Sequence, residues 1–160
     1  DVINGVPSLG YILMDEASGN YFGKRIIRNY FYKRMPKTIA KMFEEQFDID
    51  PDIIKRRVYK ENNPNTYLAN FAEFILRNKR NSYSQKVLEK GINVFFKTRI
   101  LTFDNAENVP VHFVGSIAYF AKDVIEKIAQ KHGVKLGNIV RRPIDGLIEY
   151  HREKLKLEQG

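Results

Sequence analysis

The sequence predicts a helix-rich α/β protein, and three observations lead to this class. Apolar residues recur at helical spacing through most of residues 20–103. Two short apolar runs, 111–114 and 136–140, flank a further helical pattern and predict a strand–helix–strand unit. Such a unit forms a parallel strand pair with a right-handed crossover. The length of 160 residues suits one compact domain.

The first hundred residues are expected to form mostly helices. Residues 9–13 are short and apolar and are predicted as a strand, followed by a turn and a helix over about 21–33. Three later helix starts are indicated by proline at the first helical position or by a capping residue, at Pro36, Asp50-Pro51 and Asn63-Pro64. Ser82 or Ser84 is expected to cap a longer helix, in which Gly91 indicates the close approach of another backbone.

The last third carries the predicted strand–helix–strand unit. Residues 102–110 are expected to form a loop, and 111–114 a strand that is buried on both faces. The helix that begins at Gly115-Ser116 should end at Gly133 before the strand at 136–140. A turn at 143–146 and a final helix from Leu147 follow. A parallel sheet needs more strands than these, and because the first residue is Asp1 rather than Met, we expect the missing strands to precede it.

Composition excludes several kinds of chemistry within this chain. Because it contains no cysteine, it can form no disulfide, thiolate metal site or cysteine nucleophile. No apolar run approaches the roughly 20 residues that cross a bilayer, so we expect no membrane partner and a cytoplasmic location. The net charge is +8, and residues 24–60 alone hold eleven basic and five acidic residues, a net of +6. This field favours an anion, such as a nucleotide, a nucleic acid or an acidic partner.

Two short segments could carry chemistry. Asp15 and Glu16 follow the predicted strand and open a helix, where they could accept hydrogen bonds from substrate hydroxyls or orient a metal-bound water. Acidic residues in a first turn also simply suit the helix dipole, and that alternative stays open. Gly115, Ser116 and Ile117 end a strand and begin a helix, a place where phosphate or heterocycle groups can bind, or where the chain merely turns. The three histidines lack metal-ligand spacing, so no metal site is predicted.

The basic segment also contains aromatic residues, which is raw material for nucleic-acid binding. These aromatic residues lie at core spacing and the charges at outer positions, which favours a solvated helix face. We therefore do not expect nucleic acid as the partner, although a basic helical nucleic-acid binder remains an alternative. The aromatic residues concerned are Tyr21, Phe22, Tyr30, Phe31, Tyr32 and Tyr59.

Three segments together resemble the BadF/BadG/BcrA/BcrD-type ATPase and N-acetylglucosamine kinase family. Residues 6–19 are similar to a family motif close to L-G-x-x-x-G-D-E-G-S-G, residues 114–118 to its adenosine motif, and residues 143–151 to its terminal P-x-x-G-L segment. They occur in the family's order and span nearly the whole chain. Met14 and Ala17 stand where the family has glycine, which could reshape the acidic loop.

The resemblance implies a lobe of an actin-like, ribonuclease H-like ATPase fold. The chain would be most of the C-terminal lobe, with a helical portion at about 20–103 and a strand–helix–strand portion at about 111–158. Asp15 and Glu16 would bind hydroxyls of an amino-sugar, and Gly115, Ser116 and Ile117 would line the adenosine pocket. ATP and Mg²⁺ are the implied cofactors. The N-terminal lobe, with the general base, would precede Asp1, so this chain contributes no catalytic residue and should be inactive alone.

The function expected from this resemblance is that of an ATP-dependent sugar kinase acting on a hexosamine such as N-acetylglucosamine. An ATPase that activates a partner enzyme is a second alternative, besides the nucleic-acid binder. Partners would be the small sugar, ATP and the other lobe of the same protein, and a homodimer is left open. Asp15 and Gly115 are expected to line opposite sides of one cleft.

Overall fold

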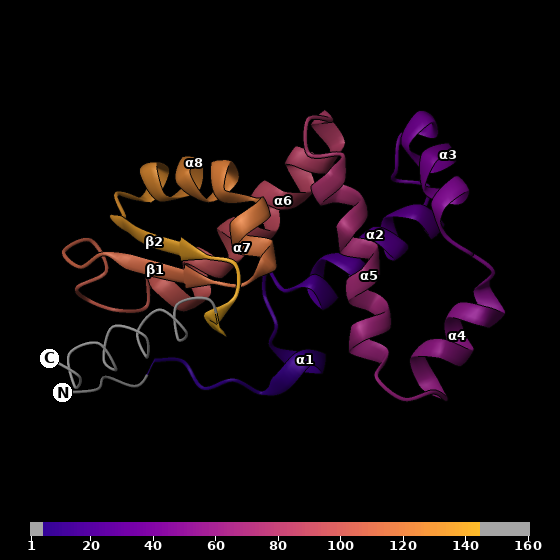
Figure 1. Ribbon diagram of the computed structural model, residues 1–160, viewed down its shortest axis with the longest axis horizontal. Helices are drawn as coiled ribbons and strands as arrows, with labels where there is room; N and C mark the ends of the chain where they lie inside the picture. The colour runs from indigo at the N-terminus through magenta and orange to yellow at the C-terminus, as the bar shows by residue number, and fades with distance from the viewer. Residues whose placement is uncertain (1–4, 145–160) are drawn as a thin grey trace, which may run out of the picture. The chain divides into compact units, whose positions relative to one another are not determined.

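The chain divides into two compact units, Asp1–Asp104 and Asn105–Gly160, and the computed structural model describes residues 5–144 of it (Figure 1). The first is all helical, and the second holds a small parallel sheet with helices. Among residues 5–144 there is no helix with both the length and the apolar character needed to cross a membrane.

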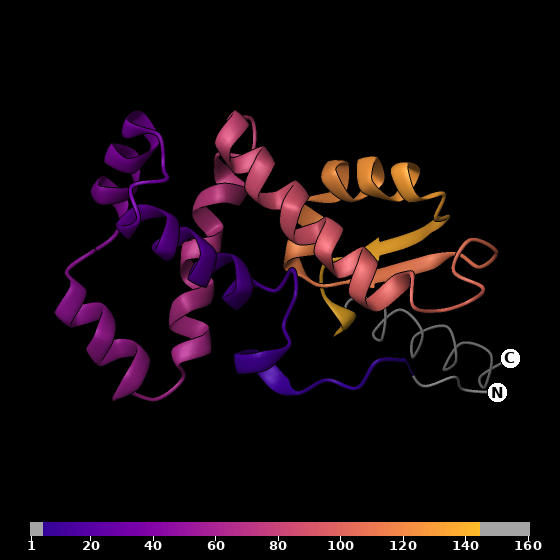
Figure 2. The ribbon, with the colours of Figure 1, turned by 180° about the vertical axis from the view of Figure 1, so that it is seen from behind.

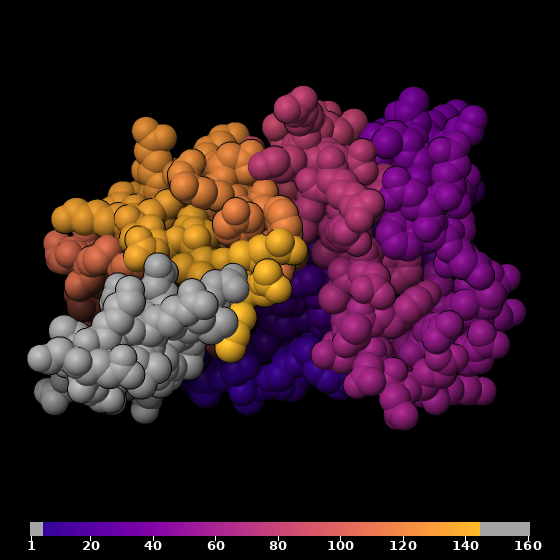
Figure 3. All heavy atoms as spheres, viewed as in Figure 1, coloured from indigo at the N-terminus to yellow at the C-terminus, as the bar shows by residue number. Residues whose placement is uncertain are grey.

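Helices and one π-helical turn build the first unit, and Figure 3 shows α3, α4 and α5 forming one continuous surface on the visible face. Its elements are α1 (Gly10–Leu13), α2 (Gly19–Phe31), α3 (Lys37–Gln46), α4 (Pro51–Tyr59), α5 (Pro64–Arg77), α6 (Ser82–Phe95) and η1 (Phe96–Ile100).

The core of this unit forms where α2 crosses α5. Gly23 lets the two helices meet, because a Cβ there would lie 1.8 Å from the Leu68 carbonyl oxygen. Phe22 and Ile26 on α2 are fully buried. A group of aromatic rings with centroids 4.8–6.4 Å apart joins α3 and the residue after it to α5, through Phe43, Phe47, Phe71 and Phe74.

The strand predicted at residues 9–13 is wrong, because this segment forms the one-turn helix α1. No strand of the described first unit is available to pair with it. Its backbone is instead satisfied locally, with the Met14 N–H donating to the Gly10 carbonyl at 2.8 Å. Ile12 and Leu13 stay 73% and 70% exposed.

The helix starts are mostly where the sequence predicts them. Asp50 caps α4 by accepting from the N–H groups of Asp52 and Ile53. Pro36 is the N-cap of α3 rather than its first residue. Asn81 caps α6 in place of Ser82 or Ser84, since its side chain accepts from the Tyr83 N–H.

Gly91 has a different neighbour from the one expected. A Cβ at this position would lie 2.4 Å from the ring of Phe22 and 2.9 Å from that of Tyr21, so side chains rather than backbone approach it. The reason is that α2 packs its aromatic residues, not its glycines, toward this part of α6.

The second unit confirms the predicted strand–helix–strand arrangement (Figure 2). β1 (Val111–Val114) pairs in parallel with β2 (Leu136–Val140), and α7 (Ser116–Phe120) and α8 (Lys122–His132) connect them. Gly133 ends α8 in the left-handed conformation, as expected. The final helix from Leu147 lies outside the described residues, as does most of the turn at 143–146.

The prediction that β1 is buried on both faces is wrong. Its residues alternate between half-buried and exposed, and Val114 is 60% exposed. This alternation is the pattern of a strand with one covered face. His112 lies on the exposed side, where its Nδ1 accepts from the Asn138 N–H at 3.0 Å and its ring occupies the space above Gly137.

Candidate functional site

Asp15 lies in the loop between α1 and α2 and is held by three side-chain donors. Ser18 Oγ donates to Asp15 Oδ2 at 2.9 Å, and Asn20 Nδ2 donates to the same oxygen. Lys24 Nζ forms an ion pair with Oδ1 at 3.2 Å and also donates to the Tyr11 carbonyl. The Asp15 side chain is only 12% exposed. The start of α2 thus supplies the whole pocket that fixes this carboxylate.

Glu16 is fixed from a distant part of the chain. Both Nε and an Nη of Arg99 lie 3.3 Å from Glu16 Oε2. The other Nη of Arg99 donates to the Val6 carbonyl at 2.9 Å. The guanidinium in η1 therefore ties the N-terminal segment and the acidic loop to the same point. Because Arg99 is 83 residues from Glu16, no local sequence pattern could have revealed this pair.

The two carboxylates retain acceptor capacity. Glu16 Oε1 has no hydrogen-bond partner among the described residues, and Asp15 Oδ1 receives only Lys24. An ionised carboxylate offers about four acceptor positions. The loop can therefore still accept hydrogen bonds from the hydroxyls of a polyol, while the neighbouring cations keep both carboxylates oriented.

Ala17 gives this loop its shape. It adopts φ of 60°, a left-handed conformation that favours glycine. The Ser18 N–H donates to the Asp15 carbonyl at 2.9 Å, and Ser18 Oγ accepts from the Tyr21 N–H to begin α2. The backbone at Ala17 thus has a conformation that favours glycine, although the residue is alanine.

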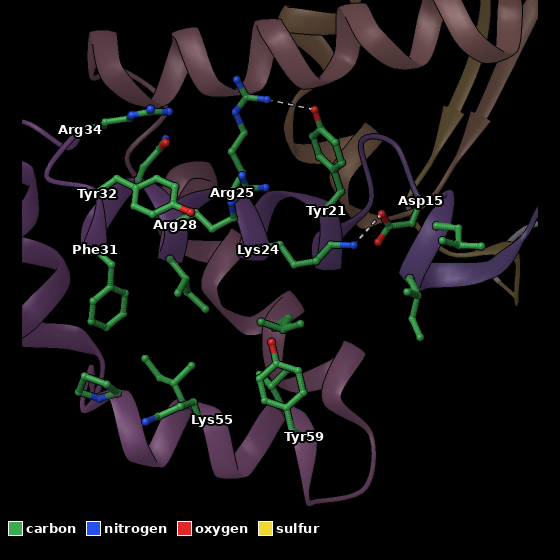
Figure 4. A pocket seen from close by; sticks show the side chains of 18 of the residues that line it. Asp15, Tyr21, Lys24, Arg25, Arg28, Phe31, Tyr32, Arg34, Lys55 and Tyr59 are labelled. Atoms are coloured by element: carbon green, nitrogen blue, oxygen red, sulfur yellow. Dashed lines mark hydrogen bonds and ion pairs between the residues drawn. The ribbon is translucent and has the colours of Figure 1, made fainter.

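A cavity of about 860 Å³ opens beside this loop, along α2 and α4 (Figure 4). Asp15 and Glu16 are among the residues that line it, and Ile27, Ile54 and Leu68 contribute apolar lining. Phe31 points from α2 toward α4, and Tyr59 points from α4 toward α2. Its basic lining residues are Lys24, Arg25, Arg28, Arg34 and Lys55.

The interpretation of the aromatic residues as core is correct only in part. Phe22 is fully buried. Phe31, Tyr32 and Tyr59 are 41%, 57% and 81% exposed and line the cavity. They lie at the end of α2 and on α4, where no other helix of the described residues covers these side chains. Periodicity alone could not reveal this.

The second predicted segment lies in the second unit. Gly115 adopts φ of 133°, which favours glycine, and a Cβ there would meet no atom within 4 Å. Its N–H donates to the Val140 carbonyl at 2.9 Å, which joins the carboxyl ends of β1 and β2. Ser116 does not cap the helix, because Gly115 is the N-cap and no side-chain cap bond forms. The helix is also broken after Phe120, since α8 starts separately at Lys122.

Asp15 and Glu16 belong to the first unit, and Gly115, Ser116 and Ile117 belong to the second. Their meeting at one cleft stays a prediction. In the part of the chain that the structure describes, no three His, Asp or Glu residues gather where they could hold a metal ion.

The described architecture is a helix-rich α/β fold with a small parallel sheet, and it is similar to that of a solved crystal structure. The crystal structure in question comes from Porphyromonas gingivalis and bears the description "Putative N-acetylglucosamine Kinase". The TM-score is 0.85 and the sequence identity 30% over 92% of this chain. This chain spans 52% of the length of that one. No family model matches the sequence, and no curated protein does so either.

Proposed function

We propose that this chain forms part of an ATP-dependent sugar kinase that phosphorylates a hexosamine such as N-acetylglucosamine. The observation that carries the proposal is the structural likeness to the Porphyromonas gingivalis protein over 92% of this chain. The BadF/BcrA-type family and its actin-like fold remain the more specific proposal, supported by the motif resemblance at residues 6–19 and 114–118.

In this proposal Asp15 and Glu16 accept hydrogen bonds from sugar hydroxyls. Support comes from the acceptor positions left on Asp15 Oδ1 and Glu16 Oε1, and from the cations that orient both groups. A hydrogen bond to a charged group contributes about 1.5–3 kcal/mol, enough to select a ring with correctly placed hydroxyls. No catalytic base is proposed within these residues.

Gly115, Ser116 and Ile117 are proposed to line the adenosine pocket. Their place at the carboxyl end of two parallel strands is where ligands of open α/β sheets bind. The open space at Gly115, where no atom lies within 4 Å of a Cβ position, leaves room for a heterocycle. When bound, ATP with Mg²⁺ would supply the phosphoryl group, and this chain would position it.

Product analysis on the whole protein tests the proposal. The protein containing this chain is incubated with Mg²⁺-ATP and N-acetylglucosamine, and the products are separated. Phosphorylated sugar is expected; free phosphate alone would instead indicate an ATPase and contradict the proposal. Residues 1–160 alone are expected to give neither product.

Matched variants test the acidic loop. Asp15→Asn and Glu16→Gln keep size but weaken acceptance from hydroxyls, so kcat/KM for the sugar should fall at least about tenfold each. Glu73→Gln is the control, because Glu73 is exposed on α5 and pairs only with Arg77, four residues further along the helix. Unchanged kcat/KM in both loop variants would remove Asp15 and Glu16 from the sugar site.

A further inference from the structure

The segment from Ala17 to Phe43 contains no carboxylate but seven basic residues. Three of them, Lys24, Arg25 and Arg28, lie within two turns of α2. Like charges three or four residues apart repel on a helix and reduce its stability. An anion bound beside α2 would relieve this repulsion.

The arginines of this cluster lack acidic partners. Lys24 pairs with Asp15, and Lys55 pairs with Asp52 at 2.5 Å. Arg25, Arg28 and Arg34 form no ion pair with any carboxylate of residues 5–144. All three line the 860 Å³ cavity. They therefore supply positive charge to a concave surface whose two lining carboxylates, Asp15 and Glu16, pair with Lys24 and Arg99 instead.

Aromatic rings hold these arginines in place. Arg28 and Arg34 lie 5.8 and 5.3 Å from the centroid of the Tyr32 ring, within the range of cation–π contacts. The third guanidinium, that of Arg25, donates to the Tyr21 hydroxyl at 3.2 Å (Figure 4). The guanidinium groups are thus partly ordered before a ligand arrives, which lowers the entropy cost of binding.

We propose that this cavity binds a small phosphate monoester that carries a ring, with Arg28 and Arg34 as the main phosphate contacts. Arginine forks match phosphate oxygens bidentately. The exposed rings of Phe31 and Tyr59 and the apolar lining at Ile27 and Ile54 would contact the ring of the ligand. The cavity volume lies within the range typical of small-ligand sites, about 300–1,000 Å³. The site shares this cavity with Asp15 and Glu16, the proposed sugar contacts, but its phosphate contacts are other residues, so its test does not depend on kinase activity.

Calorimetric titration of the 160-residue chain tests the proposal. The probes are AMP and glucose 6-phosphate, with adenosine and glucose as their uncharged counterparts. Both phosphate esters are expected to bind at low salt and the uncharged compounds to bind at least about tenfold more weakly. The tighter of the two esters shows whether a nucleoside or a sugar carries the phosphate.

Two double variants, each of which removes two positive charges, show where the phosphate esters bind. R28Q/R34Q should weaken binding of the phosphate esters at least about tenfold, because each arginine contributes charge-assisted hydrogen bonds. R56Q/R57Q is the matched control on α4: both arginines pair with Glu61 and neither lines the cavity. It should change the affinity less than about twofold.

Three results would overturn the proposal. They are no binding of either ester, equal losses of affinity in R28Q/R34Q and R56Q/R57Q, and a single-stranded oligonucleotide that binds through the same arginines far more tightly than AMP. The last result would identify a nucleic-acid interface instead. None of these results depends on whether the whole protein phosphorylates a sugar, so the failures of the two proposals can be told apart.

Discussion

Ala17 shows how a single backbone conformation shapes the acidic loop. At φ of 60° its Cβ is crowded by the backbone, which costs roughly 1–2 kcal/mol for a residue other than glycine. Two hydrogen bonds of Ser18 on its C-terminal side, to the Asp15 carbonyl and from the Tyr21 N–H, hold the turn closed. The strain is therefore retained at the place where Asp15 and Glu16 are presented.

Replacing Ala17 with glycine should stabilise the protein. The variant A17G removes the crowding at positive φ, and the free energy of unfolding should rise by about 0.5–1 kcal/mol after the entropy cost of glycine is subtracted. Urea denaturation measures the change. Ala40→Gly inside α3 is the control and should lower the free energy of unfolding by up to about 1 kcal/mol. A loss of stability in A17G would show that the turn does not strain Ala17.

Tyr83 makes the free energy of unfolding depend on pH in the alkaline range. Burial raises the pKa of Tyr83 above its ordinary value of 10.0, against the lowering effects of the Asn29 hydrogen bond and of Arg25. The folded state thus binds the phenol proton more tightly than the unfolded state. The contribution of this proton to the free energy of unfolding is fully present below about pH 10. It is lost as the pH rises through the pKa that Tyr83 has in the folded protein.

Comparison with the variant Y83F tests this pH dependence. The free energy of unfolding of the unchanged protein should fall more steeply above pH 10 than that of Y83F, which has no group to titrate there. The two should run parallel between pH 7 and 9, offset by the lost hydrogen bond from Asn29 Nδ2. Urea unfolding at intervals from pH 7 to 11 measures both curves. Identical slopes above pH 10 would rule out a raised pKa.

At the scale of elements, the sequence predicts helices better than it predicts what covers them. Asp50 and Gly133 mark element ends through local chemistry, and both predictions are confirmed. The predictions of a strand at residues 9–13 and of burial on both faces of β1 are wrong, because each property depends on neighbouring elements. A short apolar run becomes a strand only beside another strand, and sequence spacing does not say whether one is present.

The α2–α5 crossing should tolerate no side chain at Gly23. A Cβ at this position would lie 1.8 Å from the Leu68 carbonyl oxygen, so G23A must push the helices apart. We expect a loss of about 3 kcal/mol in the free energy of unfolding, measured by urea denaturation. G19A on the same helix is the matched comparison, since its Cβ would meet the Ala69 side chain at 3.0 Å. A smaller loss is expected there, and equal losses would contradict the role of backbone contact.

At the scale of the whole molecule, part of the candidate site is predictable and part is not. Asp15 and Glu16 stand out because adjacent carboxylates open a helix, and Gly115 because it ends a strand. The partners that orient the carboxylates are not evident from spacing: Lys24 lies on a helix rich in cations, and Arg99 lies in the distant π-helical turn. Tertiary contacts of this kind follow from packing, which a local pattern does not encode.

The division into two units predicts that their cores open separately. Ile125 on α8 is 2% exposed inside the second unit, so Ile125→Ala should cost about 3 kcal/mol there by removing buried methyl groups. If opening is local, amides of α8 and β2 should exchange hydrogen roughly a hundredfold faster, whereas those of α5 should not change. Phe74→Leu, in the core of the first unit, is the reciprocal variant, and it should accelerate hydrogen exchange of the amides of α5 but not of those of α8. Hydrogen exchange followed by mass spectrometry resolves these segments. Equal acceleration of both units in either variant would show that the 160 residues unfold as one cooperative body.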